Sequence, residues 1–316
     1  MSKVFEIRRY TSERAEEWDA FVERSKNGTF LFDRRYMDYH SDRFKDYSLM
    51  FYYKNRLYAL LPANIQNDIL YSHQGLTYGG LVMGNRCTTA HVRELFYEMN
   101  AWLREAGIKR VVYKHIPWVY TVLPAEEDLF ALTNCCKANL SSRDVASVVI
   151  LNRRLKFSTL RSRCVKKAQK AQLEICESND FAGFWSLLEE NLMRRHQAKP
   201  VHSLKEIQLL RSRFPEKIRL FVALKDNRML GGTVLYMHQQ IVKTQYISAN
   251  EEGRKLGALD LLFNELLEQF ASEGLSFFDF GTSNQVDTDD LNDSLIFQKE
   301  GFGGRAICYD TYEWKL

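Results

Sequence analysis

The chain has 316 residues, of which 45% are hydrophobic and 13% are aromatic, and its formal net charge is +4 at pH 7. This length suggests two domains, and the composition is typical of a globular protein. No apolar run approaches the ~20 residues that span a bilayer, and residues 1–10 carry charges where a signal peptide needs an apolar core. We therefore expect no transmembrane segment and a cytoplasmic location.

The six cysteines form no CxxC pair. In a reducing compartment they are most simply free thiols. His196 and His202 lie close in sequence but lack a third ligand at suitable spacing, so we expect no metal site.

Three apolar runs joined by polar turns mark the first half of the chain. They cover residues 47–53, 57–65 and 69–76. Runs this short, bounded by Asn, Asp, Gln and Arg, fit the strands of an antiparallel meander better than separate helices. A helix over about residues 89–106 and a strand over residues 108–114 are expected to follow.

The basic segment between Val145 and Leu173 contains eight Lys or Arg residues and no acid. Leu160, Cys164, Ala168 and Ala171 give it an apolar stripe at helical spacing. One interpretation is a solvated helix face. The other is a surface that contacts the phosphates of a nucleotide-linked substrate, a CoA tail or an RNA.

The second half of the chain repeats the order of the first. A helix carrying Trp185 is capped by Asn179 or Asp180, and a capping box at Ser203 opens another helix. The predicted strands are 218–225, 229–236, 241–248, 275–280 and 306–314, with helices over 259–270 and 290–299. Two similar halves predict two α/β (α+β) domains, at residues 1–145 and 146–316.

A turn with two glycines, Asn250–Gly257, leads from a predicted strand into a helix. The first-turn N–H groups of a helix have no intrahelical partner, and the helix dipole favours an anion there. The turn is therefore a candidate phosphate site.

This order of elements resembles the Gcn5-related N-acetyltransferase (GNAT) fold in the duplicated form of the FemAB-type and related acyltransferases. The resemblance rests on five stretches: Lys166–Ala168, Leu230–Gly232, Gln245–Ser248, Asp279–Asn284 and Lys299–Gly303. It implies tandem GNAT-like domains, each with a mixed, largely antiparallel sheet flanked by helices. It also implies acyl transfer from a thioester or aminoacyl ester to an amine, without a metal.

The resemblance places the donor, acetyl-CoA or another acyl-CoA, on the second domain. A backbone N–H in the central strand polarises the donor carbonyl in this fold. The expected donor-binding residues are Ile247, Ser248, Ala249, Gly253, Arg254, Lys255, Gly257 and Ala258. The family's acyl-CoA signature is Gln/Arg-x-x-Gly-x-Gly/Ala, and Arg254–Gly257 matches only its first half.

Four residues are candidates for catalysis: Tyr246, His196, Asp279 and Lys299. Tyr246 is a possible proton donor to the leaving group, although an aromatic residue in a central strand also fits the core. His196 is a candidate general base. Lys299 lies where FemAB-type proteins place a lysine before a Gly-Phe-Gly turn; Gln298 is the alternative register, and a solvated lysine is the alternative role.

Acceptor recognition is expected from both halves. The candidates are Arg35, Tyr36, His73, Arg163, Lys167, His202, Gln245, Thr282, Ser283 and Asn284. Arg35 and Tyr36 resemble the site where the family holds the acceptor's phosphates, and His73 is expected to line a cleft between the copies. Around Asp279–Asn284 the alternative is a turn whose side chains satisfy backbone donors.

Three functions remain open. The first is an acyl-CoA-dependent N-acyltransferase acting on an amino sugar or amino-acid group of a cell-envelope polysaccharide or peptidoglycan precursor, with a small-molecule or nucleotide- or lipid-linked acceptor. The second is a FemAB-like aminoacyl transferase that uses charged tRNA. The third is a non-catalytic duplicated binding module.

Overall fold

The computed structural model describes residues 3–285 and 290–316, without the side chains of Arg195 and His196. The chain forms two compact units: Met1–Asp144 with Cys308–Leu316, and Val145–Ile307. The sequence-based boundaries placed the last strand in the second domain. In the structure its residues from Cys308 onward belong to the first unit, because they pair with that unit's strand β7 (Arg110–Lys114).

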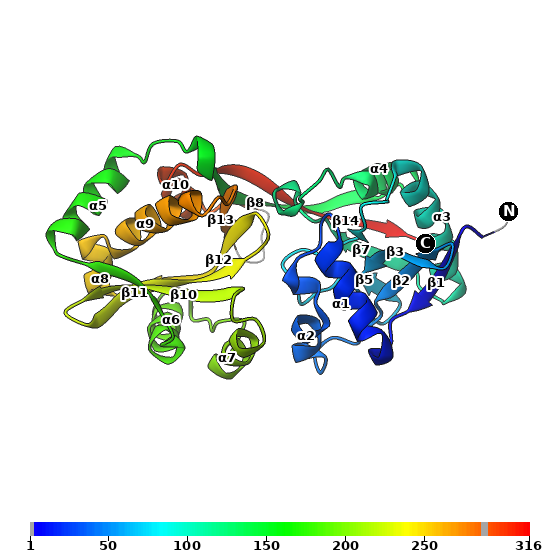
Figure 1. The fold of residues 1–316 in the computed structure, drawn as a ribbon, viewed down its shortest axis with the longest axis horizontal. Coiled ribbons are helices and arrows are strands. Elements are labelled where there is room, and N and C mark those ends of the chain that lie inside the picture. The colour runs from blue at the N-terminus through cyan, green and yellow to red at the C-terminus, as the bar shows by residue number, and fades with distance from the viewer. Residues whose placement is uncertain (1–2, 286–289) are drawn as a thin grey trace. The chain divides into compact units, whose positions relative to one another are not determined.

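The first unit contains two groups of paired strands with helices packed on them (Figure 1). One sheet has the order β1-β2-β3-β6, and β4, β5, β7, β14 and β8 pair in that order. The strands are β1 (Phe5–Arg9), β2 (Leu49–Tyr53), β3 (Arg56–Leu61), β4 (Asn64–Gln66), β5 (Ile69–Tyr71), β6 (Val82–Met83), β7, β8 (Asn139–Ile150) and β14 (Arg305–Lys315). The helices are α1 (Ala15–Arg24), α2 (Arg34–Met37), α3 (Thr89–Glu105) and α4 (Glu127–Asn134).

The predicted three-stranded meander of the first half is wrong in one respect. The run 57–65 breaks at Pro62 into β3 and β4, and these two strands belong to different sheets. Proline has no N–H to donate to a strand ladder, so an unbroken strand through this position is disfavoured.

The second unit is built on strands β8-β13-β12-β11-β10-β9, in that order. Its strands are β9 (Glu174–Ser178), β10 (Ile218–Lys225), β11 (Arg228–Met237), β12 (Ile241–Ala249) and β13 (Phe277–Thr282). Its helices are α5 (Thr159–Lys170), α6 (Phe181–His196), α7 (Leu204–Arg213), α8 (Glu251–Leu256), α9 (Ala258–Ser272) and α10 (Asp293–Gly301). Helices α6 and α7 lie on one face of the sheet and α9 on the other, with α5 along α9 (Figure 1).

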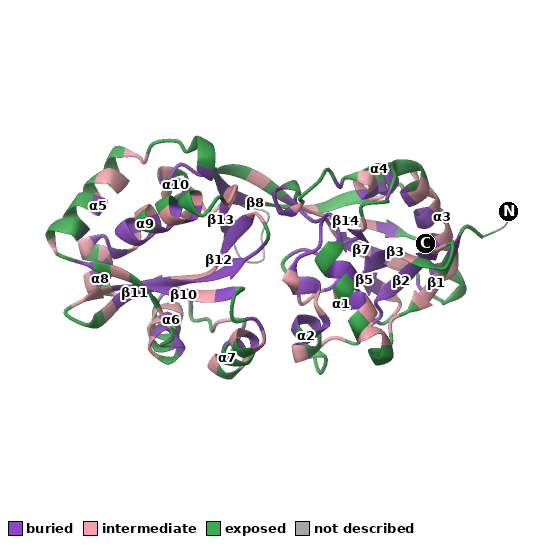
Figure 2. Ribbon diagram, viewed as in Figure 1, coloured by how far each residue is buried: buried purple, intermediate pink, exposed green. Residues whose placement is uncertain are grey.

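Several sequence expectations for the second unit are confirmed. The meander β10–β11–β12 is antiparallel, Asp180 caps α6, and Ser203 with Glu206 forms the capping box of α7. The main core of this unit packs phenylalanines and leucines of α9 against Phe278 and Phe280 of β13, and buried residues follow these elements in Figure 2. The expected apolar stripe of α5 is only partly buried: Ala168 is enclosed, whereas Leu160 is 48% exposed. Among the described residues, no helix has both the length and the apolar character needed to cross a bilayer.

Candidate functional site

The sheet of the second unit opens between β12 and β13. Parallel pairing joins only Ile241–Lys243 to Phe277–Asp279. On its other side β12 stays paired with β11 as far as Ala249, with a register shift at Val234/Leu235. From Thr244 onward, the edge of β12 that would pair with β13 therefore faces an opening in the sheet.

The register shows which backbone groups face this opening. The N–H of Asn250 donates to the carbonyl of Leu230 at 2.9 Å. Hydrogen-bonded pairs alternate along an antiparallel ladder, so the backbone groups of Ser248 and Tyr246 point to β11 and those of Ala249 and Ile247 point away from it. The Ala249 carbonyl accepts from Asn191 Nδ2 at 2.8 Å. The N–H of Ile247 is directed into the opening.

A cavity of about 290 Å³ occupies the opening. Most of its wall is apolar and comes from α6, α9, β13 and α10. The apolar lining residues are Leu188, Leu192, Ile247, Ala249, Leu259, Phe263, Phe280, Leu295 and Phe302, and the polar ones are Asn191, Ser248, Arg254, Gln298 and Lys299. An apolar cavity with a few convergent polar groups is the usual form of a small-molecule site.

Lys299 forms the polar end of the cavity wall. Its side chain is 6% exposed, and Nζ donates to the carbonyls of Gly281 at 2.9 Å and Thr282 at 2.6 Å. Burial lowers the pKa of Lys299 to about 8, although the Asp279 carboxylate opposes the shift. Burial also lowers the pKa of Lys243, whose Nζ lies 3.1 Å from Gln245 Oε1. A proton can leave Lys299 at a pH close to neutral, whereas an ordinary lysine holds it.

Tyr246 and His202 meet on the face of the sheet that α6 and α7 cover. Tyr246 Oη lies 2.5 Å from His202 Nδ1, and the His202 N–H donates to the same oxygen at 3.2 Å. The Tyr246 ring packs edge-on against Trp185, with 5.0 Å between ring centroids. Since neither Tyr246 nor His202 lines the cavity, the pair fixes β12 beside it.

A family of known domains matches this part of the chain. The match is to the acetyltransferase (GNAT) domain and covers residues 156–288. We refer to the matched residues, 156–288, as the GNAT domain because of this similarity. The expectation of an acyltransferase is confirmed by this match.

Solved structures extend the likeness beyond the matched residues. FemX superposes with a TM-score of 0.70 at 11% identity, over 98% of this chain and 97% of FemX. L-PGS from Bacillus licheniformis gives a TM-score of 0.62 at 12% identity, over 96% of this chain and 91% of L-PGS. A tandem GNAT protein from the clavulanic acid biosynthesis pathway gives 0.51 at 12% identity, over 98% of each chain. A search of the curated proteins found no match.

At these identities the solved structures establish the fold and nothing further. They confirm the predicted mixed α/β fold and its likeness to the tandem GNAT and FemAB-type proteins. The opening between β12 and β13 lies inside the GNAT domain.

The predicted donor turn is more tightly built than the sequence suggests. Residues 251–256 form the short helix α8, and the Gly253 N–H donates to the Asn250 side chain at 2.8 Å. Gly257 adopts φ 81° beside α5, where an added Cβ would lie 2.6 Å from the Cys164 carbonyl. Gly253, Lys255, Gly257 and Ala258 do not line the cavity, whereas Arg254 does.

The N-terminus of α9 adjoins this turn. It has no side-chain cap, and its first residue is Ala258. The acid in its first turn, Asp260, is paired with Arg161 at 2.8 Å. The first-turn N–H groups of α9 thus fit an anion, and Arg161 balances the only acid in that turn.

The candidates beyond Asp279 mostly serve the fold of the GNAT domain. Asp279 is fully buried and accepts the Gly281 N–H at 2.6 Å, and Asn284 accepts the Val145 N–H at 2.8 Å. The carbonyl of Thr282 holds Lys299, and Ser283 is buried. Asp279 and Asn284 follow the alternative interpretation, in which side chains of the turn accept from backbone donors.

Arg163 and Lys167 lie on the exposed side of α5 and do not line the cavity. The side chain of His196 lies outside the described residues. Among the described residues, no group of three or more His, Cys, Asp or Glu side chains is placed to hold a metal ion.

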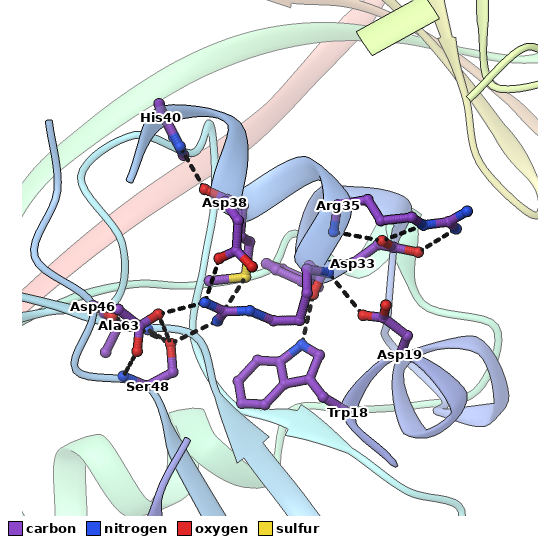
Figure 3. A network of polar contacts seen from close by, with 12 residues as sticks. Trp18, Asp19, Asp33, Arg35, Asp38, His40, Asp46, Ser48 and Ala63 are labelled. Carbon is purple, nitrogen blue, oxygen red and sulfur yellow. Dashed lines mark hydrogen bonds and ion pairs between the residues drawn. The ribbon is translucent and has the colours of Figure 1, made fainter. Parts of the chain in front are cut away.

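In the first unit, the candidate arginine region is an internal network (Figure 3). Arg34 is buried and donates to Asp46 at 2.9 Å, to Asp38 at 2.5 Å and to Ser48 at 3.3 Å. Arg35 is 60% exposed and pairs with Asp33 at 2.7 Å.

The other first-unit candidates are enclosed. Tyr36 is 4% exposed and His73 is 3% exposed. His73 stacks on His40 with 5.3 Å between ring centroids, and burial lowers its pKa to about 3.

Sequence reasoning missed Asn191, which belongs to the polar part of the cavity wall, and Lys243, which is buried in β12 but does not line the cavity. Asn191 bridges α6 to β12 through Ser248 Oγ at 2.6 Å and the Ala249 carbonyl. Lys243 is buried beside Gln245. A lysine within a predicted central strand was a usable signal for Lys243; a single Asn on an amphipathic helix offered none for Asn191.

Proposed function

We propose that the GNAT domain transfers an acyl group, such as acetyl, from acyl-CoA to an amine. The observation that carries the proposal is the cavity at the unpaired edge of β12, with the Ile247 N–H directed into it. An N–H fixed in this way can hydrogen-bond the oxyanion that forms when the amine attacks the donor carbonyl.

The cavity suits the donor's acyl end and the arm that carries it. Its walls are apolar, and its volume of about 290 Å³ is near the lower end for ligand sites. The N-terminus of α9 is suited to the donor's phosphates. Arg254 lines the cavity close to that turn and is held by Asn191 Oδ1 at 3.1 Å.

Lys299 is the proposed proton acceptor. With a pKa of about 8, Lys299 is neutral in a substantial fraction of the molecules at slightly alkaline pH. The neutral amine takes the proton that the acceptor's nitrogen loses as the C–N bond forms, and the thiolate of CoA leaves. Activity then rises with pH through about 8.

The acceptor proposed is a primary amine on an amino sugar or amino-acid group of a cell-envelope precursor, small, nucleotide-linked or lipid-linked. The likeness to FemAB-type acyltransferases suggests this class. It is tested by offering a panel of such amines with radiolabelled acetyl-CoA and following label transfer.

The donor is tested by thermal unfolding in the presence of CoA. CoA at one hundred times its Kd stabilises the fold by about 2.7 kcal/mol, which raises Tm by roughly 5–10 °C for a domain of this size. Leu295→Trp fills the cavity from α10 and should abolish the shift. Ile296→Trp is the matched control. Ile296 follows Leu295 in α10 and is also half-buried, but its side chain does not line the cavity.

Each outcome separates the candidate functions. A CoA shift in the wild type and the Ile296→Trp control, lost in Leu295→Trp, supports the proposal. Acyl transfer from charged tRNA, with no Tm shift in CoA, would show that the donor is an aminoacyl ester and not a thioester. No transfer from either donor would leave a binding module.

A further inference from the structure

The loop and helix that precede the GNAT sheet carry an uncompensated positive surface. Seven cations form it, and none has an acidic partner among the described residues: Arg153, Arg154, Lys156, Arg163, Lys166, Lys167 and Lys170. The eighth cation of the segment, Arg161, is the one that pairs with Asp260. We call these seven residues, with the leucines described below, the basic surface.

The geometry of α5 turns these charges outward. Val165 and Ala168 are buried on the side that packs along α9. Arg163, Lys166, Lys167 and Lys170 recur at helical spacing away from these two residues and are exposed. Much of the α5 ribbon is coloured as exposed in Figure 2. Four like charges on one helix face repel one another, which costs stability unless an anion covers them.

Two exposed leucines accompany the charges. Leu155 is 47% exposed in the loop before α5, and Leu160 is 48% exposed in its first turn. Each is separated by one or a few residues from several of the seven cations. Large apolar side chains beside cations are characteristic of surfaces that lie at a membrane interface, where apolar groups enter the headgroup region and cations contact the lipid phosphates.

A cavity of about 560 Å³ lies between this loop, α5 and α9. Three cations line it, Arg154, Lys156 and Lys166, and one acid, Glu268. The other lining residues include Leu155 and Val165 and the polar Ser162, Gln169 and Asn264. Phe157 also lines it and contacts Phe302 of the acyl cavity, with 5.4 Å between ring centroids. It is therefore a second cavity, separated from the proposed acyl site by the contact of these two rings. Its lining has an excess of cations, three against one acid, beside apolar and uncharged polar side chains.

We propose that the basic surface docks on an anionic membrane surface, with a phospholipid phosphate among Arg154, Lys156 and Lys166. The exposed leucines favour a lipid over an RNA, since single-stranded nucleic acid is held by cations together with aromatic rings on which bases stack. The described part of this surface exposes no aromatic ring as fully as these leucines. The inference extends beyond acyl transfer and does not depend on which donor the GNAT domain uses.

The test is co-sedimentation of the full chain with vesicles. Vesicles of phosphatidylcholine containing phosphatidylglycerol should bind the protein, vesicles of phosphatidylcholine alone should not, and binding should weaken steeply with added salt. Lys156→Glu/Lys166→Glu/Lys170→Glu should lower the affinity by about 100-fold or more, because each cation near an anionic surface contributes roughly a five-fold factor.

A matched variant controls for net charge. Lys199→Glu/Lys205→Glu/Lys217→Glu changes the same total charge at exposed lysines outside the basic surface and should bind vesicles nearly as the wild type does. Leu155→Ser/Leu160→Ser keeps every cation and should still weaken vesicle binding about ten-fold, as expected from the lost apolar insertion. Circular dichroism confirms that each variant is folded.

Three results would overturn the proposal. The first is equal binding of the wild type to neutral and anionic vesicles. The second is an equal loss of vesicle affinity in the basic-surface lysine variant and in its matched control. The third is binding to a single-stranded RNA that survives the leucine changes, with no vesicle binding, which would assign the surface to nucleic acid. Vesicle binding is read without any transferase assay, so its failure is distinct from failure of the proposed function.

Discussion

The buried amine of Lys299 makes a prediction that can be worked from the structure. Its pKa is about 8 in the fold and 10.5 as the ordinary value, because burial disfavours the charged form. Between these values the unfolded chain binds more protons than the folded one, so stability rises with pH through this window and is constant below it. The full gain is about 3 kcal/mol, from about 1.4 kcal/mol per pH unit.

Lys299→Met removes this titration and keeps a side chain of similar length. At pH 7 two effects oppose each other in the variant: the carbonyls of Gly281 and Thr282 lose their donor, and the penalty of burying a charge disappears. Between pH 8 and pH 10 the stability of the variant relative to the wild type should fall by about 2–3 kcal/mol, because only the wild type gains stability there. Titratable groups that the wild type and the variant share contribute equally to both free energies of unfolding, so they cancel in the difference.

The assay is urea unfolding at several pH values, read by fluorine NMR on 5-fluorotryptophan. Trp185 is the only tryptophan between residues 145 and 307, so its resonance reports the second unit, and Trp185→Phe assigns it. Lys217→Met, at an exposed position, controls for the loss of one lysine. A stability difference between Lys299→Met and the wild type that stays constant from pH 7 to pH 10 would refute the reasoning.

Two further pairs of variants test the packing around the candidate sites. Gly257→Ala and Gly274→Ala both place Ala at positive φ, but only at Gly257 does the new Cβ meet a backbone atom, the Cys164 carbonyl at 2.6 Å. Both should lose about 1–2 kcal/mol from backbone strain, and Gly257→Ala should lose at least about 1 kcal/mol more by thermal unfolding; equal losses would contradict the packing of α5 on this turn. In the first unit, Arg34→Met should cost about 2–4 kcal/mol, because Asp38, Asp46 and Ser48 lose their hydrogen bonds to a buried guanidinium. Arg35→Ala should cost less than about 1 kcal/mol in a urea titration, because its pair with Asp33 is exposed; similar costs would show that the network of Figure 3 is not what holds this region.

Much of the second unit could be predicted from local signals. The apolar runs of β10, β11 and β12 are bounded by turn residues, and the capping box at Ser203 identifies the start of α7. In the first unit the same reasoning joins β3 to β4, because apolar residues dominate the run 57–65 on both sides of Pro62. Which sheet each half enters depends on partners distant in sequence, and no local pattern encodes them.

The candidate site shows the same limit. Lys299 and Arg254 were predicted from motifs, and both line the cavity. Tyr246 and His202 were both named, but only the fold shows that they bind each other, across 44 residues of sequence. Asn191 was missed because its role comes from the place where α6 crosses β12.

What the sequence determined by itself was the meander β10–β12, the helices that begin at capping signals, the charge of α5 and the glycine turn before α9, since each follows from spacing, residue type and backbone freedom within a few residues. What only the tertiary structure decided was the opening between β12 and β13, the cavity within it and the burial of Lys299. These features arise where segments far apart in the chain pair or fail to pair. The proposed chemistry depends on two results of that packing: burial sets the pKa of Lys299, and the unpaired edge of β12 leaves the Ile247 N–H directed into the cavity.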